Sequence, residues 1–186
     1  MTVREIKVID DPVLRRKAKK IDKFTPETRK LIEDMIDTMR AAPGVGLAAP
    51  QVGASERVIV VEYAEEAEED AEPAAPPKKK KLYAVINPEI VWASDEIIEG
   101  TEGCLSIPGW TGDVLRPEAI VVKGRNRSGQ RIKIKAEDWL ARIFQHEIDH
   151  LDGILYIDRL IAPDRFRRIT SGAEETAEEK AAEAIG

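Results

Sequence analysis

The chain has 186 residues, of which 42% are hydrophobic and 34% charged. It is therefore long enough to bury a core, and it is neither a fully disordered chain nor a fibrous repeat. The formal net charge of −6 argues against a general affinity for nucleic acid phosphates, and no direct reading of nucleic acid is expected, although a local basic patch is compatible with it. No stretch approaches the roughly 18 apolar residues of a membrane helix, so no membrane association is expected.

The N-terminal segment predicts no export signal, because it lacks an apolar core and contains acidic residues. Cys104 is the only cysteine, so no internal disulfide can form. Both features favour a reducing compartment, and we expect a cytoplasmic protein.

The first helix is predicted to begin at Thr25-Pro26-Glu27, where a threonine N-cap precedes a proline at the first helical position. Apolar residues then recur at helical spacing as far as Met39, and Pro43-Gly44 ends the element. This apolar stripe is interpreted as a core-facing surface.

After a glycine- and alanine-rich segment, β-branched runs predict strands at 57–61, 82–86, 97–99, 119–123 and 131–135. Asn126 to Gly129 is predicted to be the turn between the last two. Residues 64–81 form a low-complexity stretch, acidic first and basic last, which we interpret as a flexible charged insertion at a hairpin tip.

A second helix is predicted from about Glu137 to Leu151, and a third from Pro163 onward. The fold class predicted is α+β, with antiparallel sheets packed around a central helix and with an N-terminal and a C-terminal helix. Residues 1–165 are expected to form a single domain, followed by a helical or frayed tail over 166–186.

The predicted central helix carries the only two histidines, His146 and His150. They are four residues apart, so both imidazoles project from one face of the helix, within reach of one cation. Glu147 lies one step further round, where its carboxylate can approach a water molecule at that cation. This H-E-x-x-H pattern is typical of metal-dependent hydrolases, and it predicts a metallohydrolase domain.

A hydrolytic metal site needs a third protein ligand and one open position. One protease pattern places a third histidine after a glycine, and here Gly153 is present but Tyr156 stands at the histidine position. Another pattern uses a downstream glutamate, and the candidates Glu174 and Glu175 lie in the Ala/Glu-rich tail. The remaining soft ligand is Cys104, which follows a glycine and has polar neighbours. A site of one cysteine and two histidines is therefore favoured over a glutamate site.

The first six residues of the segment from Gly44 to Gln51 match the dinucleotide-binding pattern G-x-G-x-x-A. The context does not fit that pattern, because the segment follows a helix instead of a strand, and Pro50 interrupts the helix that should come next. Two interpretations remain open. The segment is either a packing turn or a tight wall that lets backbone approach a ligand, with the Gln51 amide as a donor.

Together, three segments resemble peptide deformylase. They are Gly44-Val45-Gly46-Leu47-Ala48-Ala49-Pro50-Gln51, Glu102-Gly103-Cys104-Leu105-Ser106 and Gln145-His146-Glu147-Ile148-Asp149-His150. Their order and spacing agree with the family pattern, and the resemblance spans roughly residues 5 to 165. The charged insertion and the Ala/Glu tail depart from it.

The resemblance implies a metal-dependent hydrolase that removes the N-formyl group from the N-terminal formylmethionine of newly made polypeptides and releases formate. Cys104, His146 and His150 would hold one divalent ion, Fe²⁺ by preference, with Zn²⁺ or Ni²⁺ able to occupy the site. Glu147 would act as base and then acid.

The resemblance also assigns the remaining site residues. The Gln51 side chain and the backbone N–H of Leu105 would stabilise the oxyanion. Gly46 would place its backbone against the peptide, and Val45 and Ile143 would line the pocket for the methionine side chain.

The expected partners are formylmethionyl nascent peptides, with a transient ribosome contact, a monomeric state and a bacterial cytoplasmic location. The alternatives are an H-E-x-x-H metalloendopeptidase with Glu174 as third ligand and a structural metal site in a binding module. Two expectations about supporting residues are open: Glu102 pairs with Arg116 either behind the site or as a surface pair that contributes little, and Asp149 either orients an imidazole or faces solvent.

Overall fold

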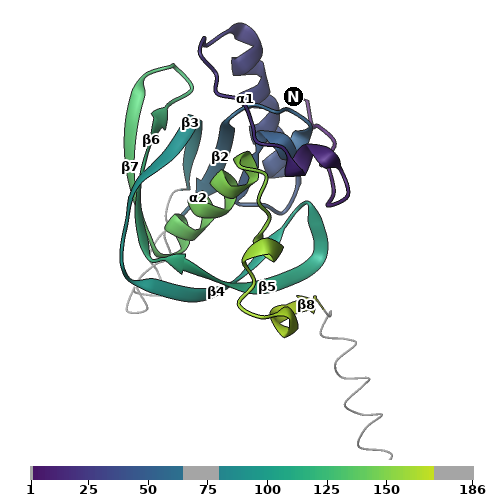
Figure 1. The fold of residues 1–186 in the computed structure, drawn as a ribbon. Coiled ribbons are helices and arrows are strands. Elements are labelled where there is room, and N and C mark those ends of the chain that lie inside the picture. The colour runs from purple at the N-terminus through teal and green to yellow at the C-terminus, as the bar shows by residue number, and fades with distance from the viewer. Residues whose placement is uncertain (1, 65–79, 170–186) are drawn as a thin grey trace, which may run out of the picture.

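The computed structural model describes residues 2–64 and 80–169. Two antiparallel sheets and two α-helices make up these ranges (Figure 1). The helices are α1 (Pro26–Ala41) and α2 (Asp138–Leu151). The strands are β1 (Gly46–Ala48), β2 (Val58–Tyr63), β3 (Lys81–Ala93), β4 (Ile97–Cys104), β5 (Ile107–Pro117), β6 (Ala119–Arg125), β7 (Arg131–Glu137) and β8 (Phe166–Arg168). Short 3₁₀ helices lie at Pro12–Arg15, Ala49–Val52, Tyr156–Arg159 and Pro163–Arg165.

The larger sheet has five strands in the order β1-β2-β3-β6-β7, and the smaller has three in the order β4-β5-β8. Every neighbouring pair is antiparallel. The long pairing of β4 with β5 ends in a turn just after Cys104, so this cysteine sits at the tip of a hairpin.

Helix α2 packs against β1, β2 and β7 of the larger sheet and against β5 of the smaller one (Figure 1). Its buried apolar residues recur at helical spacing, and Phe144 and Leu151 are fully enclosed among side chains of β2, β3 and β6. Helix α1 packs against β1 and β2 in a separate apolar cluster. Helix α2, which carries the H-E-x-x-H motif, is therefore held in place by contacts with both sheets.

The structure confirms the mixed composition of helices and antiparallel strands. Thr25 caps α1 by accepting a hydrogen bond from the Thr28 N–H, and α2 begins and ends within one residue of the predicted bounds. The predicted turn before β7 is present, where the Asn126 side chain accepts hydrogen bonds from the Ser128 and Gln130 N–H groups.

The predicted C-terminal helix starting at Pro163 is wrong over the residues described. Only a short 3₁₀ turn forms at Pro163–Arg165, and Phe166–Arg168 pairs with β5 as strand β8. The Phe166 ring stacks on Trp110 at a centroid distance of 4.6 Å, so contact with the sheet overrides the local proline signal.

The ends of the predicted insertion need one correction, because Lys81 is the first residue of β3. The rest of the insertion from 65 to 79, and the tail from 170, lie outside the described residues. Across the two ranges that are described, we find no helix with the length and apolar character to cross a membrane.

Candidate active site

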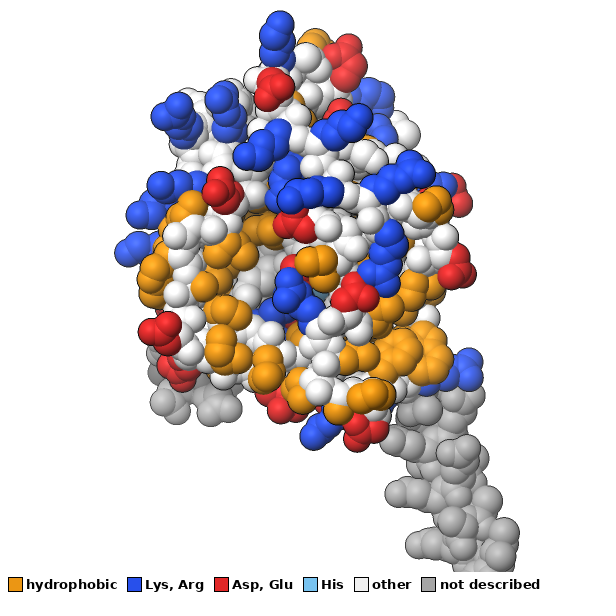
Figure 2. Space-filling view, in the orientation of Figure 1, with side chains coloured by type: hydrophobic (Ala, Val, Ile, Leu, Met, Phe, Trp, Pro, Cys, Tyr) orange, Lys and Arg blue, Asp and Glu red, His pale blue; other side chains and the backbone are white. Residues whose placement is uncertain are grey.

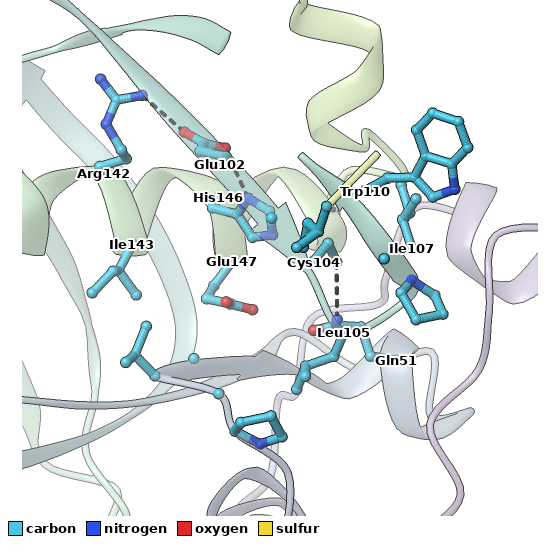
Figure 3. A pocket seen from close by; sticks show the side chains of 18 of the residues that line it. Gln51, Glu102, Cys104, Leu105, Ile107, Trp110, Arg142, Ile143, His146 and Glu147 are labelled. Atoms are coloured by element: carbon cyan, nitrogen blue, oxygen red, sulfur yellow. Dashed lines mark hydrogen bonds and ion pairs between the residues drawn. The ribbon is translucent and has the colours of Figure 1, made fainter. Parts of the chain in front are cut away.

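One pocket of about 550 Å³ collects the predicted site residues. Its walls come from the segment after α1, from β1, from the tip of the β4–β5 hairpin and from α2 (Figure 3). The predicted residues that line it are Val45, Gly46, Gln51, Cys104, Leu105, Ile143, His146 and Glu147. His150 lies one helical turn beyond His146 and is almost fully buried.

Cys104, His146 and His150 converge. Their ligand atoms all lie within 4.8 Å of one another, and the Cys104 Sγ is 3.2 Å from the His150 Nε2. They form the one such group of three or more metal-ligating side chains found among the residues that the structure places. The four-residue spacing of the histidines and the hairpin tip bring the three together.

The donors fit a divalent cation. One thiolate and two imidazoles form a set that suits Fe²⁺ and Zn²⁺. Burial and the neighbouring His146 lower the pKa of His150 well below its ordinary value, which keeps that imidazole in the neutral form that binds metals. Burial opposes a charge on His146, but contacts with Cys104 and Glu102 raise its pKa well above the ordinary value, so the site favours positive charge there.

Glu102 holds the His146 ring from behind. Its Oε2 lies 2.8 Å from the His146 Nδ1, so the opposite ring nitrogen is directed to the metal site. Arg116 donates two hydrogen bonds of 3.0 Å to the same carboxylate, and Arg142 donates one of 3.1 Å. Burial would raise the pKa of Glu102, but hydrogen bonds with His146 and Arg116 lower it to about 2.

The expected pairing of Glu102 with Arg116 is therefore present, and it is buried, not a surface pair. Asp149 is also buried, but its side-chain hydrogen bonds go to arginines and not to an imidazole. It accepts a hydrogen bond of 2.5 Å from Arg116 and two of 2.6 Å from Arg159. The role expected for Asp149 on an imidazole belongs to Glu102, with Asp149 fixing the arginine behind it.

Glu147 projects from α2 into the pocket beside β1 (Figure 3). A Cβ placed on Gly46 would come within 2.3 Å of the Glu147 Oε1, so this strand position accommodates only glycine while the carboxylate stays in place. Of the buried side-chain oxygens in the described ranges, the Glu147 Oε2 is the one without a hydrogen-bond partner. Burial is the main cause that raises the pKa of Glu147 to about 7.

Gln51 lies at the 3₁₀ turn that follows β1, with its amide fixed at both ends. The Gln51 Oε1 accepts a hydrogen bond of 2.8 Å from the Ala48 N–H, and the Nε2 donates to the Ser106 hydroxyl at 3.1 Å and contacts the Cys104 Sγ at 3.5 Å. The donor end therefore faces the metal site. The segment lines the pocket through Gly44, Val45, Gly46 and Gln51, which favours the tight-wall interpretation over a packing turn.

The sequence prediction missed two groups of pocket residues. Arg142 lies four residues before His146, so helical spacing was a signal that could have found it. The rim residues Trp110 and Ile169 had no such signal, because β5 and β8 were not predicted. Gly44, Glu102 and Gly103, which belong to the predicted motif segments, also line the pocket, and the further lining residues not predicted are Pro43, Ile107, Pro108, Gly109 and Trp139.

Comparison with known proteins points to one family. Residues 3–166 match the family model of polypeptide deformylase. A peptide deformylase of Symbiobacterium thermophilum is 48% identical over 97% of this chain and 76% of its own length, and one of Halothermothrix orenii is 49% identical over 87% and 96%. The crystal structure of peptide deformylase from Ehrlichia chaffeensis in complex with actinonin superposes with a TM-score of 0.77, at 39% identity over 89% of this chain and 92% of that one.

Proposed function

Because this chain belongs to the polypeptide deformylase family, we propose that it removes the N-formyl group from the N-terminal formylmethionine of newly made polypeptides and releases formate. The observation that carries the proposal is the convergence of Cys104, His146 and His150 beside the unpartnered carboxylate of Glu147. A hydrolase needs these two parts, a cation site and a nearby base, in one pocket.

We assign the metal ligands as Cys104, His146 and His150, with one divalent ion, Fe²⁺ by preference and Zn²⁺ or Ni²⁺ as substitutes. When bound, such an ion would supply Lewis acidity to a water molecule and to the formyl oxygen. The thiolate makes the donor set anionic, unlike three imidazoles, so the identity of the ion should change the rate.

Glu147 takes a proton from the attacking water and later delivers it to the departing amine. Its pKa of about 7 matches this double role, because the group can both accept and release a proton near neutral pH. The position of Gly46 supports the assignment, since the missing side chain leaves space for the carboxylate next to β1.

Gln51 and the backbone N–H of Leu105 are assigned as donors to the oxyanion. The fixed Oε1 of Gln51 keeps its Nε2 directed at the Cys104 side of the pocket, so little reorganisation is needed when charge develops. A donor of this kind is typically worth about 3 kcal/mol of barrier.

The methionine side chain is assigned to the apolar part of the pocket, between Val45 and Ile143, with the Gly46 backbone against the peptide. Val45 lies on the segment before β1, Ile143 lies on α2 one helical turn before Glu147, and both line the cavity. A thioether chain would fill such a space without polar partners.

The metalloendopeptidase alternative is not favoured, because Cys104 already completes the site with the two histidines. Glu174, its third ligand, lies outside the described residues. We further assign residues 1–165 to a single metallohydrolase domain with α2 as its central helix, acting as a monomer in the bacterial cytoplasm and in transient contact with the ribosome.

The central test measures formate release from a formylmethionyl peptide with purified, metal-loaded protein. Glu147→Gln should keep its metal content and lose activity by about a thousandfold, within the range that a general base contributes. Glu99→Gln, at an exposed glutamate of β4, is the matched control and should turn over like wild type. Wild-type turnover in Glu147→Gln would overturn the assigned role.

A second test separates a catalytic from a structural metal site. Cys104→Ala should lose most of its metal, whereas the endopeptidase alternative leaves metal content unchanged. A hydroxamate inhibitor should bind the wild-type protein, because a catalytic site keeps an open coordination position. Failure of the hydroxamate to bind a metal-loaded protein would point to a closed structural site.

A further inference from the structure

The outward face of β6 and β7 carries five basic side chains on two adjacent strands. We call Lys123, Arg125, Arg131, Lys133 and Lys135 the basic hairpin face. All five are exposed, and they alternate along the strands with inward-facing residues of the core. Between Ala119 and Ala136 the sequence contains no acidic residue.

The register of this hairpin places like charges opposite one another. Lys123 is paired with Lys133 across the strands, and Arg125 with Arg131. Directly opposed like charges destabilise a sheet. No ion pair within the described ranges involves any of these five side chains. The arrangement therefore costs stability and leaves five cations available.

Two acidic residues border the basic hairpin face. Glu89 of β3 is the cross-strand neighbour of Lys123, and Glu137 ends β7 on the same face as Lys135. Neither forms an ion pair with the five bases. The face remains positive, because five cations stand against these two carboxylates.

Protection of a sheet edge explains only part of this pattern. β7 is an edge strand, and lysines on an edge prevent pairing with other chains. However, β6 lies between β3 and β7, so Lys123 and Arg125 are not on the edge. An interior strand needs no such protection, so a role in binding an anion accounts better for its two bases.

The face is also hollowed and has an aromatic neighbour. A groove of about 530 Å³ is lined by the four bases nearest the turn, Lys123, Arg125, Arg131 and Lys133, together with Asn87 and the bulged part of β3. Trp92 on β3 is 54% exposed, and its row across the sheet runs through Val121 to Lys135. A basic groove beside an exposed ring is the arrangement that binds single-stranded nucleic acid.

The net charge of the whole chain differs in sign from that of the residues that the structure describes. Of its 29 basic and 35 acidic residues, three and 11 lie outside the described ranges. The described residues therefore carry 26 bases and 24 acids, a formal charge of +2 in place of −6. Figure 2 shows Lys and Arg side chains gathered over the upper and left parts of the visible face, where Figure 1 places the N-terminal segment and the β6–β7 turn.

We propose that the basic hairpin face binds the phosphodiester backbone of single-stranded RNA, with Trp92 stacking on a base and without reading the sequence. This goes beyond the proposed deformylation, which uses none of these residues. Binding to the backbone alone gives no sequence preference, because phosphate contacts supply affinity and position but do not read the bases.

The test measures the anisotropy of a labelled 20-nucleotide RNA of mixed sequence, titrated with the full-length, metal-loaded chain at several salt concentrations. A variant with Lys123, Arg125, Arg131 and Lys133 all changed to Gln should bind at least tenfold more weakly at about 100 mM salt. The steepness of log K against log salt should fall by about 3, because each of the four lost phosphate contacts contributes about 0.7 to it.

The matched control changes Arg16, Lys17, Lys81 and Arg168 to Gln, which removes the same charge from exposed positions elsewhere. It should retain RNA affinity within about threefold and keep the salt slope, as screening leaves only a weak general effect. Trp92→Ala should weaken binding several-fold without changing the salt slope, because stacking releases no counterions.

Equal affinity of the two fourfold variants would overturn the proposal, as would binding of the wild type to phosphatidylserine vesicles but not to RNA. A DNA of the same sequence bound with a similar salt slope would support backbone recognition, and a strong preference for one sequence would contradict it. Unchanged hydrolysis of a short formylmethionyl peptide shows that the fourfold hairpin variant is folded. If that variant does not fold, the double variant Lys123→Gln with Lys133→Gln replaces it, and the salt slope should then change by half as much.

Discussion

The charged cluster behind the pocket and the basic hairpin face use similar side chains in opposite ways. Behind the pocket, Glu102 and Asp149 are buried and each of their carboxylates is shared by two arginines. On the hairpin the bases are exposed, and four of the five lie opposite another base. Burial makes an unpaired charge too costly to keep, whereas water tolerates it. Paired charges can therefore hold a geometry, and unpaired ones can bind a partner.

The largest effect should follow from breaking the paired cluster. Glu102→Gln leaves Arg142 without a counter-charge in a buried site, leaves Arg116 with Asp149 alone, and removes the anion behind His146. We expect a loss of about 3 kcal/mol in the free energy of unfolding and a weakening of metal affinity by about tenfold or more. Urea unfolding and metal titration measure the two effects.

The matched control for Glu102→Gln is Glu99→Gln, three residues earlier on β4, whose carboxylate is half exposed and lies 3.7 Å from Arg165. It should change the unfolding free energy by less than about 0.5 kcal/mol. If both variants lose the same stability, the Glu102 cluster does not hold the site as described.

The next effect appears on acidification. The pKa of Glu102 lies at about 2 in the folded chain, below its ordinary value of 4.5, since hydrogen bonds with His146 and Arg116 outweigh burial. Its stabilising contribution is complete above pH 4.5 and is lost as the pH falls toward 2, a window worth about 3 kcal/mol. The difference in unfolding free energy between wild type and Glu102→Gln, after chelation of metal, should shrink over this range. A difference that stays constant from pH 5 to 2 would contradict the assignment.

A smaller effect should come from the contact between Gly46 of β1 and Glu147 of α2, two residues that are not part of the charged cluster. Gly46→Ala places a Cβ against the Glu147 carboxylate and forces it to move, while the metal ligands stay in place. We expect formate release to fall by about 10- to 100-fold, as for a misplaced catalytic group, with metal content unchanged. Gly103→Ala is the control, because its new Cβ would meet only ordinary contacts of 3.6 and 3.7 Å. Equal activities of the two variants would remove the steric argument.

The sequence predicted those parts of the molecule that depend on local signals. The Thr25 cap, the Asn126 turn and the four-residue spacing of His146 and His150 act within a few residues, and the structure contains all three. Strand β5 escaped prediction, because Pro108, Gly109 and Gly112 give it a weak strand propensity that pairing with β4 overrides.

In the candidate site, too, some features could be predicted from the sequence and others depend on long-range contacts. The convergence of Cys104 on the histidines was predicted from the chemistry that a third ligand requires, and geometry agrees. The arginines behind Glu102 depend on long-range contacts: Arg142 reaches a residue 40 positions away, and Arg116 connects Glu102 on β4 with Asp149 on α2. Only the fold shows that Asp149 contacts arginines and not an imidazole.

The smallest expected effect tests where the paired cluster ends. Arg159 donates two hydrogen bonds to Asp149, but its side chain is 42% exposed, and Arg116 remains bound to the same carboxylate from the buried side. An ion pair with one solvated partner contributes about 0 to 1 kcal/mol, so Arg159→Gln should lower the unfolding free energy by no more than this and leave formate release unchanged. Arg116→Gln, which removes the buried partner, is the comparison and should cost several times as much. If Arg159→Gln matches Arg116→Gln, exposure does not set the worth of these pairs, and the contrast between the buried cluster and the exposed hairpin loses its physical basis.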